Sequence, residues 1–333
     1  MSKFTLSRRG VVAGGAAALV AGQAAAPAVV RAQQGWPNGP ITWLNPFPAG
    51  GGTDVFARPL AAQVGDQLGV QILIDNKGGA GGTVGASMAA KMKPDGQTFL
   101  VGAVHHTIAP SIYKNLDYDL EKNFEPITMI ALVPQVISIN PNKVPVNTAK
   151  DFIEYVKKNP GKVNYASAGA GTAHHLAGEL FKLETKTDIV HVPYRGAGPA
   201  MQDLLAGNAD MMFDGMGTSA QQIKAGKLKG LAVAAPQRVP EFPDMPTAAE
   251  IGVPNWIVST WYGLWAIKGT PEPIVDRMYQ EIVKALNNPK LQTIWKEQTA
   301  MVGGESRPDF AKRIRAEVEK WKKVVEAAGV KLD

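Results

Sequence analysis

The stretch PFPAGGGTD, residues 46–54, decides the fold class that the sequence predicts. It follows a short apolar run, ITWLN (41–45), and precedes VFARPLAAQVGDQLG (55–69), in which apolar residues recur about every four positions. This order is typical of a strand, a glycine loop and the start of a helix. Such loops serve ATP, dinucleotides or simple anions, because the amides at a helix N-terminus favour a negative ligand.

Three later segments repeat the order of strand, glycine-containing loop and helix: residues 70–96, 163–185 and 188–215. Alternation of this kind predicts an α/β fold with mostly parallel strands in a mixed sheet. The loops are expected at the carboxyl ends of the strands, which is the edge where open α/β sheets bind ligands. From residue 271 onward the pattern is helical, and Ser306 with Asp309 resembles a capping box for the last helix.

The loop at 46–54 fits neither nucleotide motif. It has no lysine, which a GxxxxGK phosphate loop needs, and Val55 stands where GxGxxG requires its third glycine. What remains is an anion site made of backbone amides, in which three glycines are expected to take positive φ and let a ligand approach closely. A carboxylate suits this site better than a polyphosphate, because the loop holds no cation and Asp54 adds a negative charge. Asp54 itself is interpreted first as a helix cap and, alternatively, as a ligand contact.

A second loop, GAGT (169–172), offers amides in the same way about 120 residues downstream. Two such loops, one in each half of the chain, suggest a clamp on a small acid with a helix N-terminus on either side. Charge-assisted bonds of roughly 1.5–3 kcal/mol each would suffice for micromolar binding without covalent chemistry. Arg195, in VPYRGAG, is the best cation for a second carboxylate, unless it is simply a solvated surface residue.

The sequence gives little support for an enzyme. His175 and Glu179 are four residues apart and could reach one ion, but the sequence has no HExxH motif, no cysteine and no dense carboxylate group, so we expect no metal and no cofactor. Ser167 lacks the second glycine of a GxSxG nucleophile elbow. The five histidines are His105, His106, His174, His175 and His191, of which His106 and His175 lie near strand ends and are candidates for ligand contact or for polar packing.

Residues 1–32 are predicted to be an export signal, since Lys3, Arg8 and Arg9 precede an alanine-rich apolar segment. The order SRRGVV and the mild apolar core favour a twin-arginine signal over a Sec signal. Ala32 is the favoured last residue of the signal. Ala26 and Ala28 are alternatives.

The other interpretation of this segment is a membrane anchor, but residues 11–30 include three glycines, a glutamine and a proline, which do not suit a stable span. The absence of cysteine excludes lipid attachment at a cysteine and any disulfide. Without the signal the net charge of +6 falls to +2, because four of the 35 basic residues and no acidic residue leave with it. We therefore expect a soluble periplasmic protein and no nucleic-acid partner.

In these motifs the chain resembles the Bug (Bordetella uptake gene) family of periplasmic solute-binding proteins, the receptors of tripartite tricarboxylate transporters. The resemblance covers essentially the whole sequence after the signal. It rests on order and spacing of PFPAGGGTD with ARPLA, NKGGAGGTVGA with KPDGQTFLVG, PGKVNYASAGAGTAHHLAGELFK, DIVHVPYRGAGPAMQDLLAGNADMMFD, IKAGKLKGLAV, FPDMPTAAEIGVP and YGLWAIKGTP.

The resemblance implies two α/β lobes that close like a flytrap, in the type II-like periplasmic-binding-protein arrangement. Lobe 1 would comprise residues 36–135 and 261–333, and lobe 2 residues 136–260. A ligand carboxylate would be held largely by backbone amides and bridging waters. The implied site residues are Phe47, Ala49, Gly50, Gly51, Gly52, Thr53, Asp54, Gly82, Thr83, His106, Ser167, Ala168, Gly169, Ala170, Gly171, Thr172, His175, Tyr194, Arg195 and Asp214.

One local departure concerns the pocket wall. Where many relatives read STHAIN after the LVG strand, this chain has VHHTIA, so His105 and Thr107 change the wall and leave the identity of the acid open. The implied function is capture of a small carboxylic acid by a monomeric, non-enzymatic receptor and delivery to the membrane components of a tripartite transporter. A sensor role that docks on a histidine kinase, and an enzyme such as a hydrolase, are the alternatives.

Overall fold

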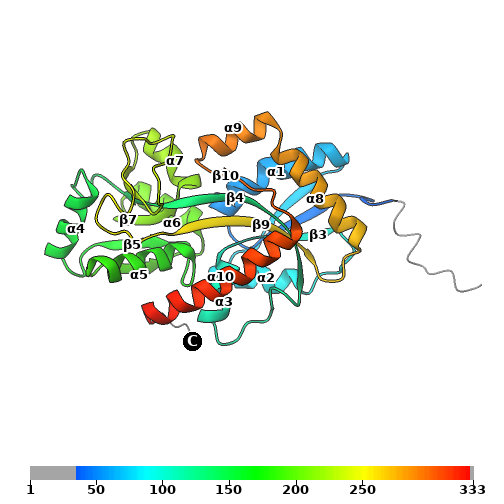
Figure 1. Cartoon of the computed structure of the whole chain (residues 1–333), viewed down its shortest axis with the longest axis horizontal. Helices are drawn as coiled ribbons and strands as arrows, with labels where there is room; N and C mark the ends of the chain where they lie inside the picture. The colour runs from blue at the N-terminus through cyan, green and yellow to red at the C-terminus, as the bar shows by residue number, and fades with distance from the viewer. Residues whose placement is uncertain (1–34, 331–333) are drawn as a thin grey trace, which may run out of the picture. The chain divides into compact units, whose positions relative to one another are not determined.

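The structure is a computed structural model that describes residues 35–330, and the chain from Pro37 onward forms one compact unit (Figure 1). The predicted export signal lies outside the described residues. None of the helices that the structure describes combines the length and the apolar character needed to cross a bilayer.

The first group of elements is built on three parallel strands. β1 (Ile41–Asn45) lies between β2 (Ile72–Asn76) and β3 (Thr98–Ala103) and pairs in parallel with both. The helices that follow these strands are α1 (Gly52–Leu68), a short 3-10 turn η2 (Ala80–Gly82) with α2 (Thr83–Ala89), and α3 (His105–Ile112). The predicted strand, loop and helix order is therefore confirmed here.

A second group repeats this plan. β5 (Asn164–Ser167) pairs in parallel with β6 (Val190–Pro193) and β7 (Met211–Gly215), so their carboxyl ends share one edge. The remaining elements of this group are α4 (Ala149–Lys158), α5 (Ala173–Thr185), α6 (Ala197–Ala206), α7 (Met216–Lys224) and β8 (Lys229–Val233).

Two long antiparallel strands, β4 (Phe124–Ile139) and β9 (Ser259–Ile267), run side by side between the two groups (Figure 1). β4 pairs with β9 as far as Pro134 and with β7 and β8 from Gln135 onward, so it changes partners at Gln135. The strand order is β2-β1-β3-β9-β4-β7-β5-β6. The α/β class with a mixed sheet is confirmed, with parallel pairs in the two outer groups and antiparallel pairs at the centre.

The chain ends with α8 (Glu272–Leu286), α9 (Pro289–Glu297), the short β10 (Met301–Val302) and α10 (Arg307–Ala328). The first half of the predicted capping box is confirmed, since Ser306 Oγ accepts a hydrogen bond from the amide of Asp309. The Asp309 carboxylate accepts from Ser306 Oγ instead of completing the box. Phe310 of α10 packs against the rings of Trp261 and Trp265 in β9, so this helix covers the central strands.

Candidate ligand-binding site

A small cavity lies where the strands of both groups end. Its volume is about 30 Å³, room for about two water molecules. It is lined by Phe47, Gly51, Gly52, Thr53, Ala103, Val104, His105, Ala168, Thr172, Ala173, His174, Ala197, Thr260 and Tyr262. These residues come from the loops after β1, β3, β5 and β6 and from β9, so both parallel groups contribute.

Two helices begin at the cavity wall. Gly51 is the N-cap of α1 and Thr172 is the N-cap of α5, and neither helix has a side-chain cap on its first amides. Thr172 Oγ1 instead donates to the carbonyl oxygen of Gly169, at 2.7 Å. Because the first N–H groups of a helix have no acceptor within it, both helices offer amides and the positive end of a dipole to an anion.

The glycines of the first loop do not all serve the purpose that the sequence predicted. Only Gly50 has a positive φ, of 82°, whereas Gly51 is extended at −83° and Gly52 is the first residue of α1. The expectation of positive φ at Gly51 and Gly52 is therefore wrong. Glycine is required at position 52 for close approach, because the hydroxyl of Tyr262 occupies the place of a Cβ atom.

Asp54 holds this loop in place. Its carboxylate accepts hydrogen bonds from the amide of Gly50 at 3.1 Å, from Arg58 Nε at 2.8 Å and from Asn76 Nδ2 at 3.1 Å. Burial raises the pKa of Asp54, but these bonds outweigh it, and the pKa lies below its ordinary value. Asp54 is the third residue of α1 and not its N-cap, so the helix starts before it and runs through Pro59.

The predicted histidines stand behind the cavity wall. Burial lowers the pKa of His106 to about 3, and its ring nitrogens lie 3.0 Å from His105 Nε2 and 3.0 Å from the hydroxyl of Tyr118. His175 Nδ1 accepts a hydrogen bond from the amide of Gly171 at 3.2 Å, and its ring stacks on that of His191. His175 thus supports the second glycine loop. The histidines that line the cavity are His105 and His174.

Two other predicted residues point elsewhere. Arg195 is exposed and does not line the cavity, and Tyr194 donates to Asp203 Oδ2 at 2.8 Å. Asp214 is fully buried next to the cavity wall, with its Oδ1 atom 3.7 Å from His174 Nε2. No lysine or arginine is among the residues that line the cavity.

The structure brings part of the predicted set to the cavity and leaves the rest around it. Phe47, Gly51, Gly52, Thr53, Ala168 and Thr172 line it. The predicted residues that do not line it are Ala49, Gly50, Asp54, Gly82, Thr83, His106, Ser167, Gly169, Ala170, Gly171, His175, Tyr194, Arg195 and Asp214.

Sequence reasoning missed the contributions of His174, Thr260 and Tyr262. His174 directly follows the GAGT loop and was available as a signal, since the first turn of a helix faces the same ligand as the loop before it. Thr260 and Tyr262 carry no such signal, because β9 reaches the cavity only through its pairing with β3 and β4.

The loops of the two groups also contact one another directly. A Cβ atom on Gly81 would lie 2.7 Å from the carbonyl oxygen of Ala170. The hydroxyl of Tyr113, at the end of α3, donates to the carbonyl oxygens of Ala80 at 3.1 Å and Ala170 at 3.2 Å. The cavity is therefore small because the loops around it are in contact.

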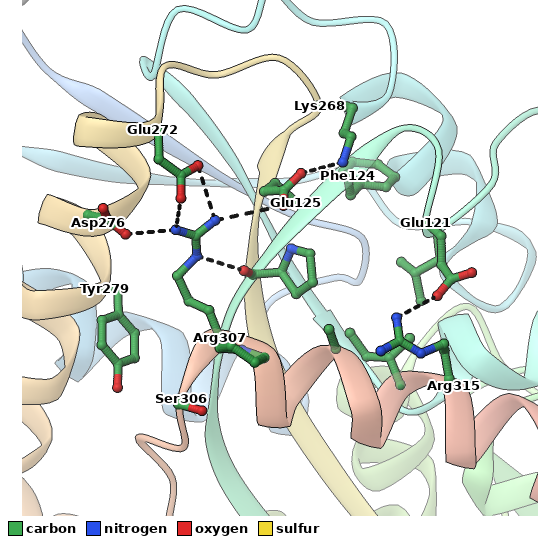
Figure 2. Close-up of a pocket in the computed structure, with 15 residues that line it drawn as sticks. Glu121, Phe124, Glu125, Lys268, Glu272, Asp276, Tyr279, Ser306, Arg307 and Arg315 are labelled. Atoms are coloured by element: carbon green, nitrogen blue, oxygen red, sulfur yellow. Dashed lines mark hydrogen bonds and ion pairs between the residues drawn. The ribbon is translucent and has the colours of Figure 1, made fainter.

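A larger groove of about 540 Å³ lies elsewhere, between α8, α10 and the start of β4 (Figure 2). Arg307 contacts Glu272, Asp276 and Glu125 there, and Figure 2 shows its guanidinium turned towards these carboxylates. Two more ion pairs join Lys268 to Glu125 and Arg315 to Glu121. Because these cations are already paired with carboxylates of the chain itself, the groove is a poor site for an acid.

In the described part of the chain, no group of three or more His, Asp or Glu side chains could hold a metal ion.

Comparison with known proteins places this geometry in a family. The model of the tripartite tricarboxylate transporter family receptor (TctC) matches residues 56–330. The chain is 34% identical to Protein BugT of Bordetella pertussis over 299 residues, 89% of this chain and 91% of that protein. The structure of the periplasmic binding protein BugD matches with a TM-score of 0.85 and 38% identity, over 89% of this chain and 99% of BugD.

Two similar structures contain an acid. A Rhodopseudomonas palustris protein with adipate has a TM-score of 0.86 and 33% identity, covering 89% of this chain and 99% of its own. MatC of the same organism, with bound malate, has a TM-score of 0.82 and 33% identity, covering 87% and 100%. The predicted two-lobed periplasmic-binding-protein fold is confirmed by these neighbours. The chain belongs to the tripartite tricarboxylate transporter receptor family, to which the Bug proteins also belong.

Proposed function

We propose that this protein is a periplasmic receptor that holds a small carboxylic acid in the cavity and delivers it to the membrane components of a tripartite tricarboxylate transporter. The observation that carries the proposal is the meeting of two uncapped helix N-termini, those of α1 and α5, at one cavity. Their amides suit a carboxylate. The malate and adipate in the two relatives are small carboxylates of the same kind.

The cavity of about 30 Å³ is too small for such an acid, so the loops around it must separate to admit one. We assign residues 36–135 with 261–333 to one lobe and residues 136–260 to the other. The change of partners in β4 at Gln135 supports a hinge there. Ligand binding would shift the population of open and closed forms towards the form that the transporter recognises.

The groups around the cavity do not suit catalysis. The amides bind charge without reacting, and the buried Ser167 is held by His191, with Ser167 Oγ 2.6 Å from His191 Nε2, away from the cavity lining. Relatives such as BugD are binding proteins. A bound acid is therefore expected to leave unchanged.

The test is calorimetry on the mature protein, stripped of ligand by unfolding and refolding, against malate, adipate and monocarboxylates. We expect at least one carboxylate to bind with micromolar affinity or better. Ala168→Leu places a larger side chain in the cavity lining and should weaken binding at least tenfold. Ala62→Leu, the same change at an exposed position of α1, is the matched control.

Recovery of every acid chemically unchanged after prolonged incubation would support the receptor role. No binding by any carboxylate to correctly refolded protein would contradict it. Uptake of the bound acid, lost on deletion of the gene and restored by the wild-type gene, tests delivery to the transporter.

A further inference from the structure

Two imidazoles face the cavity from opposite groups of strands. His105 opens α3, directly after β3, and His174 lies in the first turn of α5, directly after the GAGT loop. Their exposed fractions are 4% and 6%. Each group of strands therefore contributes an uncapped helix N-terminus and one buried histidine to the same small space.

His174 has bonding capacity that the described residues do not satisfy. Its Nδ1 atom is buried and accepts or donates no hydrogen bond among them, and the same holds for Asp214 Oδ1. These two side chains approach each other at 3.7 Å, between His174 Nε2 and Asp214 Oδ1. The other carboxylate oxygen of Asp214 accepts from Thr218 and Ser219, which fixes its position. Buried polar atoms without partners are rare, and a ligand group in the cavity would supply the missing partner.

The charged and titratable groups around His174 are few. Asp214 approaches it from β7, His105 from α3 with His106 behind, and Tyr262 lines the same cavity from β9. On α5 itself the next residues with ionisable side chains are His175 and Glu179. The lining residues of α1 and α6 are glycines, a threonine and an alanine, without charge.

We propose that His174, oriented by Asp214, contacts the part of the ligand beyond the carboxylate held by the helix N-termini, and takes up a proton when that part is a second carboxylate. His105 forms the adjoining wall. This inference rests on the proposed receptor function and concerns which acids the receptor prefers. It makes His174 a specificity-determining residue.

The balance of charge in the closed site explains why His174 would take up a proton. In the closed site burial lowers the pKa of His174 and of His105, although Asp214 acts in the opposite direction on His174, so the closed site without a second carboxylate favours the neutral form of both rings. A second carboxylate would enter next to Asp214 with no arginine or lysine to meet it. A proton on His174 supplies a positive charge between the two carboxylates, with Nε2–H facing Asp214 and Nδ1–H available to the ligand.

The experiment is calorimetric titration of the wild-type protein with malate, adipate and butyrate between pH 6.5 and 8.5. Each titration is repeated in two buffers of different ionisation enthalpy, which counts the protons taken up. We expect malate or adipate to bind with uptake of up to one proton and to gain up to tenfold in affinity per unit fall in pH. Butyrate, if it binds, should show neither effect.

His174→Gln keeps a polar side chain that cannot be charged, and should abolish both the proton uptake and the pH dependence. Lys158→Gln removes an exposed charge on α4, outside the cavity lining, and should retain both effects. Asp214→Asn provides a second variant, in which proton uptake should fall. The melting temperature of each ligand-free variant establishes that it is folded. Proton uptake by the wild-type protein is required by the proposal, and its loss in folded His174→Gln, or its reduction in folded Asp214→Asn, assigns it to His174.

Dicarboxylate binding without proton uptake, or with unchanged pH dependence in folded His174→Gln, would overturn this inference and leave the receptor function intact. Failure of the wild-type protein to bind any carboxylate at any pH would instead contradict the receptor function itself.

Discussion

A Cβ atom on Gly198 would lie 2.5 Å from the carbonyl oxygen of Ala49, so these two residues meet backbone to backbone. Gly198 is in the first turn of α6, and Ala49 is in the glycine loop before α1. Only a residue without a side chain allows such an approach. Since the two residues belong to different groups of strands, the contact requires the loops around the cavity to be closed.

Gly198→Ala should therefore weaken ligand binding by tenfold or more, about 1.4 kcal/mol, without unfolding the protein. Position 198 is helical, where alanine is favoured over glycine, so the added methyl group acts mainly against closure. Calorimetry with malate or adipate measures the effect. Gly39→Ala is the matched control, because a Cβ atom there meets nothing within 4 Å. Wild-type affinity in Gly198→Ala would show that this contact is not part of the bound state.

Tyr113→Phe should weaken binding by about three- to tenfold and speed ligand release. The change removes the hydroxyl hydrogen that the carbonyl oxygens of Ala80 and Ala170 share, and with it a link between η2 and the GAGT loop. A hydrogen bond of this kind contributes about 0.5–1.5 kcal/mol. Stopped-flow release of the ligand gives the rate. If the same variant loses affinity and ligand-free melting temperature in equal measure, the hydroxyl stabilises the fold generally and is no latch on the closed form.

Asp54→Asn should lower the free energy of unfolding at pH 7 by about 1–3 kcal/mol, because four donors lose a charged acceptor. The pKa of Asp54 is lower in the folded protein than its ordinary value of 3.8. Its contribution is thus complete above that value and is lost as the pH falls through the folded-state pKa. Urea unfolding at pH 7, 5 and 3 should show the gap between wild type and variant closing only below pH 3.8.

Asp66→Asn, an exposed change on the same helix, is the control and should leave stability unchanged at each pH. A gap of constant size down to pH 3 would mean that Asp54 acts through packing and not through its charge.

Arg307→Met should lower the free energy of unfolding by about 1–3 kcal/mol and leave the ligand affinity unchanged. The side chain is 17% exposed and joins α8, β4 and α10 through several carboxylates (Figure 2). The groove shares no lining residue with the cavity. Arg315→Met removes one exposed pair, with Glu121, and should cost at most about 1 kcal/mol. Altered carboxylate affinity in Arg307→Met would connect the groove to ligand binding after all.

Much of the fold was predictable from local patterns. The run ITWLN followed by PFPAGGGTD became β1 and α1, and VNYAS followed by GAGT became β5 and α5, because alternation of short apolar runs with amphipathic segments dictates strand and helix locally. The positive φ predicted at Gly50 is confirmed. At Gly51 and Gly52 the prediction was wrong, since glycine served close packing there and not a left-handed backbone.

The site was less predictable, because loops near a strand end can face the ligand or support those that do. His106 and His105 are neighbours in sequence and their rings are in contact, yet only His105 lines the cavity, since the ring of His106 lies behind it, against the hydroxyl of Tyr118. Arg195 looked suitable by charge alone, but it lies exposed outside the cavity.

The sequence by itself determined the α/β class, the family and the two glycine loops, because these depend on periodicity and on residues close together in the chain. Only the tertiary structure decided that Tyr262 fills the space above Gly52, that Gly198 meets Ala49 and that His174 meets Asp214. These contacts join segments far apart in sequence. The first brings β9 against the start of α1, and the second joins the two groups of strands, which β4 and β9 connect, whereas the third arises because β5, just before α5, pairs with β7. No local pattern encodes such pairing, since it is fixed by the packing of the whole sheet.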